Sequence, residues 1–143
     1  MPVTFGTRSF VRSDFDRVST TGPLNWENSP LRDGTPRELG KDANTSNPIV
    51  GVMGDPRRIT AIDITAAFDG TSATANVAVA TVLIAGAQDF AGEQAKDWVV
   101  DLLAAQEQHE AVPDVHVTRM FNGHRLEYQS WADLSFVVLT ITA

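Results

Sequence analysis

The sequence predicts an α+β domain: a mostly antiparallel sheet of four to five strands, with one long amphipathic helix on one face, preceded by an irregular N-terminal arm. Alternating apolar residues mark strands in the C-terminal part of the chain, and apolar residues at three- and four-residue steps mark the helix. Prolines and glycines crowd the first 58 residues. At 143 residues the chain has the length of one domain that can bury a core.

The irregular arm is expected to span residues 1–58, and the α+β domain residues 59–143. The arm holds six of the seven prolines and six of the ten glycines, and neither a helical nor a strand period persists through it. Large apolar side chains nevertheless recur along it, which is unusual for a solvated tail. We therefore expect the arm to pack on its own domain or on a neighbouring subunit.

The first strand of the predicted sheet covers residues 59–68, where apolar residues alternate with others. The pattern places Ile62, Ile64, Ala66 and Phe68 on one face and Ile59, Ala61, Asp63 and Thr65 on the other. The pair Asp69-Gly70 then favours a tight hairpin turn. Residues 71–86 follow as the predicted returning strand, and their apolar residues on both faces indicate a central position.

A change of period predicts the helix over residues 89–110. Its apolar stripe consists of Ala91, Ala95, Trp98, Val99, Leu102 and Leu103. Asp89 is suited to cap the N-terminus, and Pro113 prevents the helix from continuing.

The C-terminal part predicts a hairpin and a final strand. Asn122-Gly123 is a strong hairpin signal, and a two-residue turn places Phe121 opposite His124 and Val117 opposite Tyr128. The last strand, within residues 134–141, is apolar on both faces. Such a strand needs cover on both sides, so we expect it to lie inside the sheet.

The residues that could carry chemistry do not converge in the predicted fold. His109 ends the helix, and the hairpin register places His116 and His124 on opposite faces of the sheet, too divergent for a shared metal. The chain has no cysteine. We therefore expect no catalytic residue, metal or cofactor. One alternative stays open: Asp63 and Asp133 are buried acids of a small soluble enzyme or ligand-binding domain.

The charge is unevenly distributed, and this argues against a nucleic-acid partner. Residues 1–58 carry eight Lys/Arg and seven Asp/Glu, whereas residues 59–143 carry three and eleven. An acidic domain repels phosphate groups. The longest apolar run, 77–87, is too short to span a membrane, and the N-terminus lacks the apolar stretch of a signal peptide. We expect a soluble protein made in the cytoplasm.

The order of elements and two stretches of residues carry a family resemblance. "SWADLSFVVLTITA" at the C-terminus and "ANVAVATVLIAGAQDFAGEQAKDWVVDLL" before it resemble the tail terminators of long-tailed bacteriophages, the minor tail protein U family. The similarity covers residues 59–143 and not the arm. The resemblance implies a virion protein made in the host cytoplasm and a homo-oligomeric ring, expected to be a hexamer. It also implies contacts with the tail tube and with head–tail connector proteins, and no catalytic residue.

We expect the arm to be the element that assembles the ring. Its arginines supply the positive charge that an acidic domain needs to bind a copy of itself, and its aromatic residues are of the types enriched at interfaces. The candidate subunit-interface residues are Phe5, Arg8, Phe10, Arg12, Arg17, Trp26, Arg32 and Arg37, together with Asp63 of the domain.

Overall fold

The computed structural model describes residues 5–19, 22–43, 47–68, 73–107, 114–131 and 136–143. These ranges contain three helices: α1 (Arg8–Val18), α2 (Ala73–Ala91) and α3 (Glu93–Glu107). They also contain seven strands: β1 (Asn25–Asn28), β2 (Arg37–Lys41), β3 (Ile49–Asp55), β4 (Arg58–Ala67), β5 (Val115–Phe121), β6 (His124–Trp131) and β7 (Phe136–Thr142).

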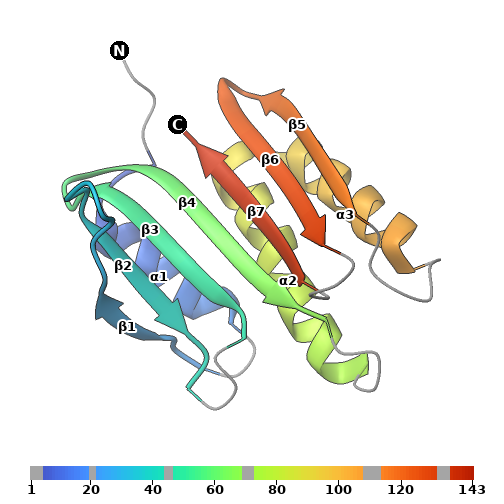
Figure 1. Ribbon diagram of the computed structural model, residues 1–143, viewed down its shortest axis with the longest axis horizontal. Helices are drawn as coiled ribbons and strands as arrows, with labels where there is room; N and C mark the ends of the chain where they lie inside the picture. Colours follow the sequence, from blue (N-terminus) through green and yellow to red (C-terminus); the bar gives the residue numbers. More distant parts are fainter. Residues whose placement is uncertain (1–4, 20–21, 44–46, 69–72, 108–113, 132–135) are drawn as a thin grey trace.

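The strands form one antiparallel sheet in the order β1-β2-β3-β4-β7-β6-β5 (Figure 1). Strands β1 to β4 follow one another as a meander, and β5 to β7 form a second one. Strand β7 joins the two meanders, because it pairs with β4 on one side and β6 on the other. The prediction that the last strand lies inside the sheet is therefore confirmed.

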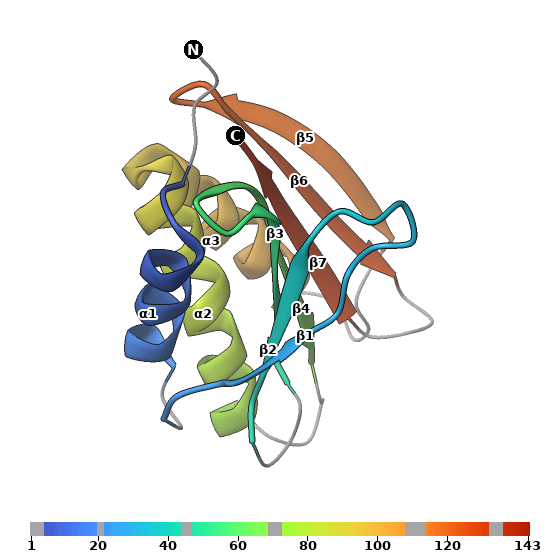
Figure 2. The same cartoon turned by 90° about the vertical axis from the view of Figure 1, so that its left-hand side faces the viewer.

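All three helices lie on the same face of the sheet, and the core is packed between the two layers (Figure 2). Val11 and Phe15 of α1 and Leu83 of α2 are fully buried against this face. The buried apolar side chains of the sheet are Val50, Val52, Ile59, Ile62, Ile64, Ala66, Phe121, Leu126, Tyr128, Val137, Leu139 and Ile141. The opposite face of the sheet, which we call the open face, carries none of the described helices.

The predicted fold class was wrong in its number of elements and in its arm. The described residues contain seven strands and three helices instead of four to five strands and one long helix. The first part of the chain is not irregular, because it forms α1 and the paired strands β1 to β3. Its described prolines stand between short elements, where Gly22 and Gly34 supply positive φ angles, whereas Gly40, Gly51 and Gly54 lie inside strands. The predicted boundary after residue 58 falls where the β3–β4 turn enters β4.

The predicted returning strand over residues 71–86 was also wrong, because residues 73–91 form α2. This helix contacts α1, α3 and the sheet. It is therefore apolar on most sides and shows no amphipathic period, while its valines and isoleucine give it the composition of a strand. Gly86 permits its close approach to the sheet, since a Cβ there would lie 2.7 Å from Cδ1 of Ile64. The expected Asp69-Gly70 turn lies outside the described residues.

The predicted helix over residues 89–110 is divided between α2 and α3. Gly92 separates the two helices with a φ of 98°. Its N–H donates to the carbonyl of Gln88 at 3.0 Å, and its own carbonyl accepts from the N–H of Lys96 at 3.1 Å. One helix thus ends and the next begins within a single residue. Trp98 of α3 packs on Phe121 and Tyr128, as expected for a core residue, with ring centroids 5.5 and 6.5 Å apart.

Strand β4 and the β5–β6 hairpin follow the sequence pattern closely. The predicted hairpin register is confirmed, and Asn122 and Gly123 adopt φ angles of 52° and 83° in the turn. In β4, the predicted faces hold for Ile62 and Asp63, but Ile59 lies on the buried face. A β-bulge next to Gly54 shifts the register of β3 against β4, and this turns Ile59 towards the core.

Candidate functional site

The histidines lie on opposite faces of the sheet, as predicted for His116 and His124. Nε2 of His116 is 2.9 Å from Oε2 of Glu127 on the open face. His124 is buried on the helix side and stacks on Phe5 with ring centroids 4.9 Å apart. Burial lowers the pKa of His124, so the ring is neutral at pH 7. Within the described ranges, no three His, Asp or Glu side chains are grouped so that they could hold a metal ion. His109 lies outside these ranges.

Arg8, Arg12 and Trp26 bind α1 to the β1–β2 hairpin of the same chain. Nη1 of Arg12 lies 3.0 Å from Oε1 of Glu38, and Nε of Arg8 lies 3.8 Å from the same oxygen. The Arg12 guanidinium also stacks over the Trp26 ring at 5.4 Å, and Nε1 of Trp26 donates to Asp16 at 2.9 Å. These three interface candidates therefore already have partners within the subunit.

The remaining candidates from the first 58 residues divide between core and surface. Phe5 is 7% exposed and packs on Phe90 as well as His124. Phe10, by contrast, is 60% exposed. Arg32 is exposed in the β1–β2 connection, and Arg37 donates from Nε to the Ser29 carbonyl at 2.7 Å. Only some of the predicted interface residues are thus accessible to a partner.

Arg17, Asp14 and Asp89 form a charged cluster between α1 and α2. Nη2 of Arg17 lies 2.7 Å from Oδ1 of Asp14 and 3.3 Å from Oδ2 of Asp89. Oδ2 of Asp14 is buried and accepts no hydrogen bond from the described residues. Burial, together with the neighbouring Asp14, raises the pKa of Asp89 to about 6. A protonated Asp89 can donate to Asp14, so the two carboxylates share a proton below that pH.

Asp63 stands in the middle of the open face. It lies opposite Gly51 on β3 and Thr140 on β7, and a Cβ on Gly51 would collide with its carboxylate. Burial raises the pKa of Asp63, and the charge of Arg37 partly opposes this shift. Asp133, the second acid of the enzyme alternative, lies outside the described residues. The nearest acid along this row of the open face is Glu127, two strands away beyond Thr140.

The open face combines apolar and hydroxyl side chains with few charges at its centre. Strand pairing places Thr65, Val138 and Gln129 in one row across β4, β7 and β6, beside the row that contains Asp63. Most of these side chains are half-buried by their neighbours in the sheet. The half-buried residues at the centre of the face are Leu39, Ile49, Met53, Ala61, Asp63, Thr65, Phe136, Val138 and Thr140.

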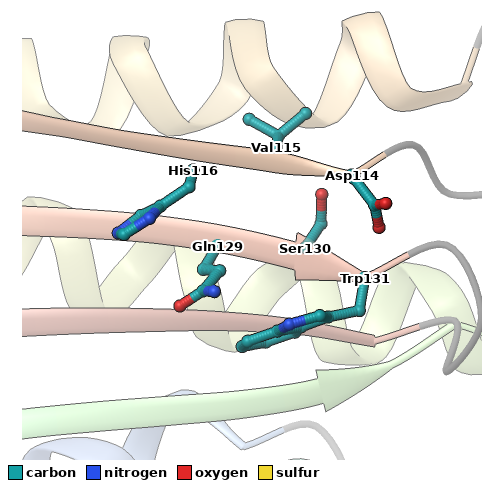
Figure 3. Close-up of a pocket in the computed structure, with 6 residues that line it drawn as sticks. All are labelled: Asp114, Val115, His116, Gln129, Ser130 and Trp131. Atoms are coloured by element: carbon teal, nitrogen blue, oxygen red, sulfur yellow. The ribbon is translucent and has the colours of Figure 1, made fainter.

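A hollow of about 340 Å³ lies at the end of this face, where β5 begins and β6 ends (Figure 3). It is lined by Asp114, Val115, His116, Gln129, Ser130 and Trp131. The Trp131 ring packs against Phe136 at 5.0 Å, so it supports the floor of the hollow. The predicted hairpin register already places His116 opposite Gln129. The sequence did not indicate the hollow itself, because its shape also depends on Trp131 packing against Phe136 of β7.

The fold and the open face define a two-layer α+β protein whose sheet is covered by helices on one side only. No family model, curated protein or solved structure matches the chain. Within the described residues, no helix is both long and apolar enough to cross a membrane.

Proposed function

We propose that this protein is a structural protein of a tailed bacteriophage virion. In this proposal it is a tail terminator or neck ring subunit that ends polymerisation of the tail tube and joins the tail to the head. Its partners are copies of itself, expected to form a hexameric ring, the tail tube and head–tail connector proteins. It is made in the host cytoplasm and acts without catalysis or a cofactor.

The observation that carries the proposal is the open face of the sheet. A half-buried apolar and threonine-rich centre around Val138 and Thr65 is typical of a surface that binds another protein. Seven strands about 4.8 Å apart, with a mean length of about 20 Å, give this face on the order of 600 Å². One partner in a specific protein interface typically buries about 800 Å². The open face is thus large enough to supply most of a contact with a neighbouring virion component.

The resemblance of the last segment, residues 130–143, indicates that the bound partner is a tail or neck protein. This segment forms β7 and the end of β6, and β7 lies at the centre of the open face. The other segment, residues 75–103, supports the resemblance less, because the strand expected there is part of α2. The acidic charge adds a second argument, because a net charge of −7 disfavours direct binding of the protein to DNA. The protein would therefore contact other tail and neck proteins rather than the genome.

A small enzyme or ligand-binding domain is the second candidate. The raised pKa of Asp63 and the hollow beside His116 favour it. The two features lie apart on the open face, since Asp63 is on β4 and the hollow is at the start of β5. An enzyme or ligand-binding domain would therefore have to use Asp63 and the hollow as two separate sites, and we rank this candidate second.

Tail-tube assembly in vitro tests the proposed function. Tube protein that polymerises in the presence of this protein should give shorter tubes, with a ring at one end visible by negative-stain electron microscopy. Val138→Arg, which places a charge in the centre of the open face, should abolish tube capping. Gln88→Arg, on an exposed position of α2 in the other layer, should leave capping unchanged.

Circular dichroism should show that both variants remain folded. Tubes of unchanged length without end rings would contradict the proposal. Equal capping by Val138→Arg and the wild-type protein would instead exclude the open face as the contact surface.

A further inference from the structure

The helix layer has two free ends. Helix α2 contacts both α1 and α3, so α1 and α3 are the outer helices of the layer (Figures 1 and 2). Helix α1 lies behind the β1–β4 half of the sheet, and α3 lies behind the β5–β6 half. Each end of the molecule therefore presents one helix and one edge strand.

Helix α3 presents an acidic stripe at its end of the layer. We define the α3 stripe as Glu93, Asp97, Val100, Asp101 and Ala104, which are all exposed. Their three- and four-residue spacing places them on one side of the helix. Lys96 is the only described basic residue of α3, and it pairs with Glu93 at 3.7 Å and Asp97 at 3.8 Å. Three carboxylates against one lysine leave a net charge of about −2.

The opposite end presents arginines around the first turns of α1. The N–H of Arg8 donates to the carbonyl of Pro56 at 2.8 Å, which fixes the β3–β4 turn beside the start of the helix. Arg57 on this turn is 93% exposed, and Arg58 is exposed next to it. We define the α1 patch as Arg12, Arg57 and Arg58; Arg8 lies beside it but is largely buried against Glu38.

The α1 patch is positive even after its internal ion pairs are counted. Glu38 pairs with Arg8 and Arg12, and Asp55 lies 3.6 Å from Arg57. Arg8, Arg12, Arg57 and Arg58 against these two carboxylates leave a local net charge of about +2, opposite to that of the α3 stripe. The α3 stripe also has an exposed apolar side chain, Val100.

Placing the α1 end of one molecule beside the α3 end of the next extends both layers at once. The same displacement brings the free edge β1 near the free edge β5 of the neighbour. Strand β5 is exposed on both faces for most of its length, and Met120 on it is 60% exposed. A neighbour at this end would cover side chains that solvent now contacts. Such a head-to-tail contact uses two different surfaces, and it closes into a ring when the rotation between neighbours permits.

We propose that copies of this chain associate head to tail, with the α1 patch of one subunit bound to the α3 stripe of the next. This inference rests on the proposed ring function and names the lateral contact of that ring. The open face takes no part in the contact and stays available to the tube. Complementary charge sets the partner and orientation of the subunits, so self-association should weaken as salt is raised.

Charge reversal at the two surfaces gives a test with internal complementation. The first variant, Arg57→Glu with Arg58→Glu, makes the α1 patch acidic. The second, Asp97→Lys with Asp101→Lys, makes the α3 stripe basic. Each variant alone then places like charges at every contact, and sedimentation velocity should show self-association at least about tenfold weaker than wild type.

Mixing the two variants in equal amounts should restore assembly, because the reversed surface of each then meets the reversed surface of the other. The unreversed surfaces also meet in the normal combination, so the mixture should form alternating rings with an even number of subunits. The matched control for the first variant is Arg32→Glu with Arg125→Glu, which makes the same change in net charge outside both surfaces. It should assemble like wild type. Thermal melts should show that all variants are folded.

The possible failures separate the contact from the function. A wild-type protein that assembles, with either reversal variant assembling equally well, would overturn the contact and leave the ring function standing. Variants that are monomeric and stay monomeric when mixed would also overturn the contact. A wild-type protein that is monomeric alone and in the presence of tail tubes would overturn both proposals.

Discussion

Among single residues, Asp14 and Asp89 make the free energy of unfolding depend on pH. The folded protein keeps a proton on Asp89 up to a pKa of about 6, whereas the ordinary value is 3.8. The folded state thus binds this proton more tightly than the unfolded chain. The contribution of the pair to stability is complete below about pH 4 and is lost as the pH rises through about 6.

We expect Asp89→Asn to remove this part of the pH dependence. It should also raise the free energy of unfolding at pH 8 by about 0.5–1 kcal/mol, a small value because the cluster is partly exposed. The neutral amide ends the repulsion and can donate to the buried oxygen of Asp14. Urea denaturation at pH 4, 6 and 8 measures the effect. Asp114→Asn, at an exposed carboxylate beside β5, is the control, and an unchanged slope for Asp89→Asn would contradict the prediction.

Two phenylalanines near the N-terminus should respond very differently to truncation. Phe5→Ala should lower the free energy of unfolding by about 3 kcal/mol, because it leaves a cavity between Phe90 and His124. Phe10→Ala should change it by less than about 0.5 kcal/mol, because the side chain is solvated. Chemical denaturation of both variants measures the difference. Equal effects would show that the segment before α1 does not belong to the core.

Among the elements, the break between α2 and α3 depends on one glycine. We expect Gly92→Ala to destabilise the protein by about 2 kcal/mol. Alanine is strained at a φ of 98°, and its Cβ would collide with the amide of Asn122, which donates to the Ala91 carbonyl at 2.8 Å. Gly34→Ala is the matched control, because Gly34 also has a positive φ but has open space around its Cα.

Gly34→Ala should lower the free energy of unfolding by about 1 kcal/mol, from backbone strain alone. Thermal melts of the two variants give the comparison. A Gly92→Ala variant no less stable than Gly34→Ala would mean that α2 and α3 tolerate a continuous helix.

For the whole molecule, residues 59–143 should not fold alone. Removing residues 1–58 exposes Ile62 and Ile64 of β4 and the face of α2 that packs on α1, and it leaves β4 as an unpaired edge. Circular dichroism should show no cooperative thermal transition for this fragment. A fragment with a sharp transition and dispersed amide signals by NMR would show that the first 58 residues are an addition to an independent domain.

Local signals in the sequence predicted those parts of the fold that depend on local forces. The Asn122-Gly123 turn needs positive φ angles, which these two residues adopt readily. The sequence therefore predicted both the position of the turn and the register of the hairpin. The apolar residues at three- and four-residue steps in α3 and the alternation in β4 arise because one side of each element faces the core. The same signals failed for α2, which is enclosed by α1, α3 and the sheet and so has no polar side to reveal its period.

The candidate site was less predictable than the fold. The sequence identified the accessible Phe10 and the central Asp63, but it could not show that Arg8 and Arg12 already share Glu38. That carboxylate comes from β2, an element that local patterns did not reveal. Charges that look available in a sequence are often neutralised by residues distant in the chain, and only the packing of α1 on the β1–β2 hairpin decides which remain free.

The sequence by itself determined that the protein is an acidic α+β domain with an interior last strand, because composition and alternation act within short segments. Only the tertiary structure decided that the first 58 residues belong to the same sheet, since β1 to β3 pair with one another in sequence and join the rest of the sheet through the pairing of β3 with β4. It also decided that all three helices lie on one face. The physical reason is that pairing and layer packing join residues far apart in the chain, where no local pattern records the partner.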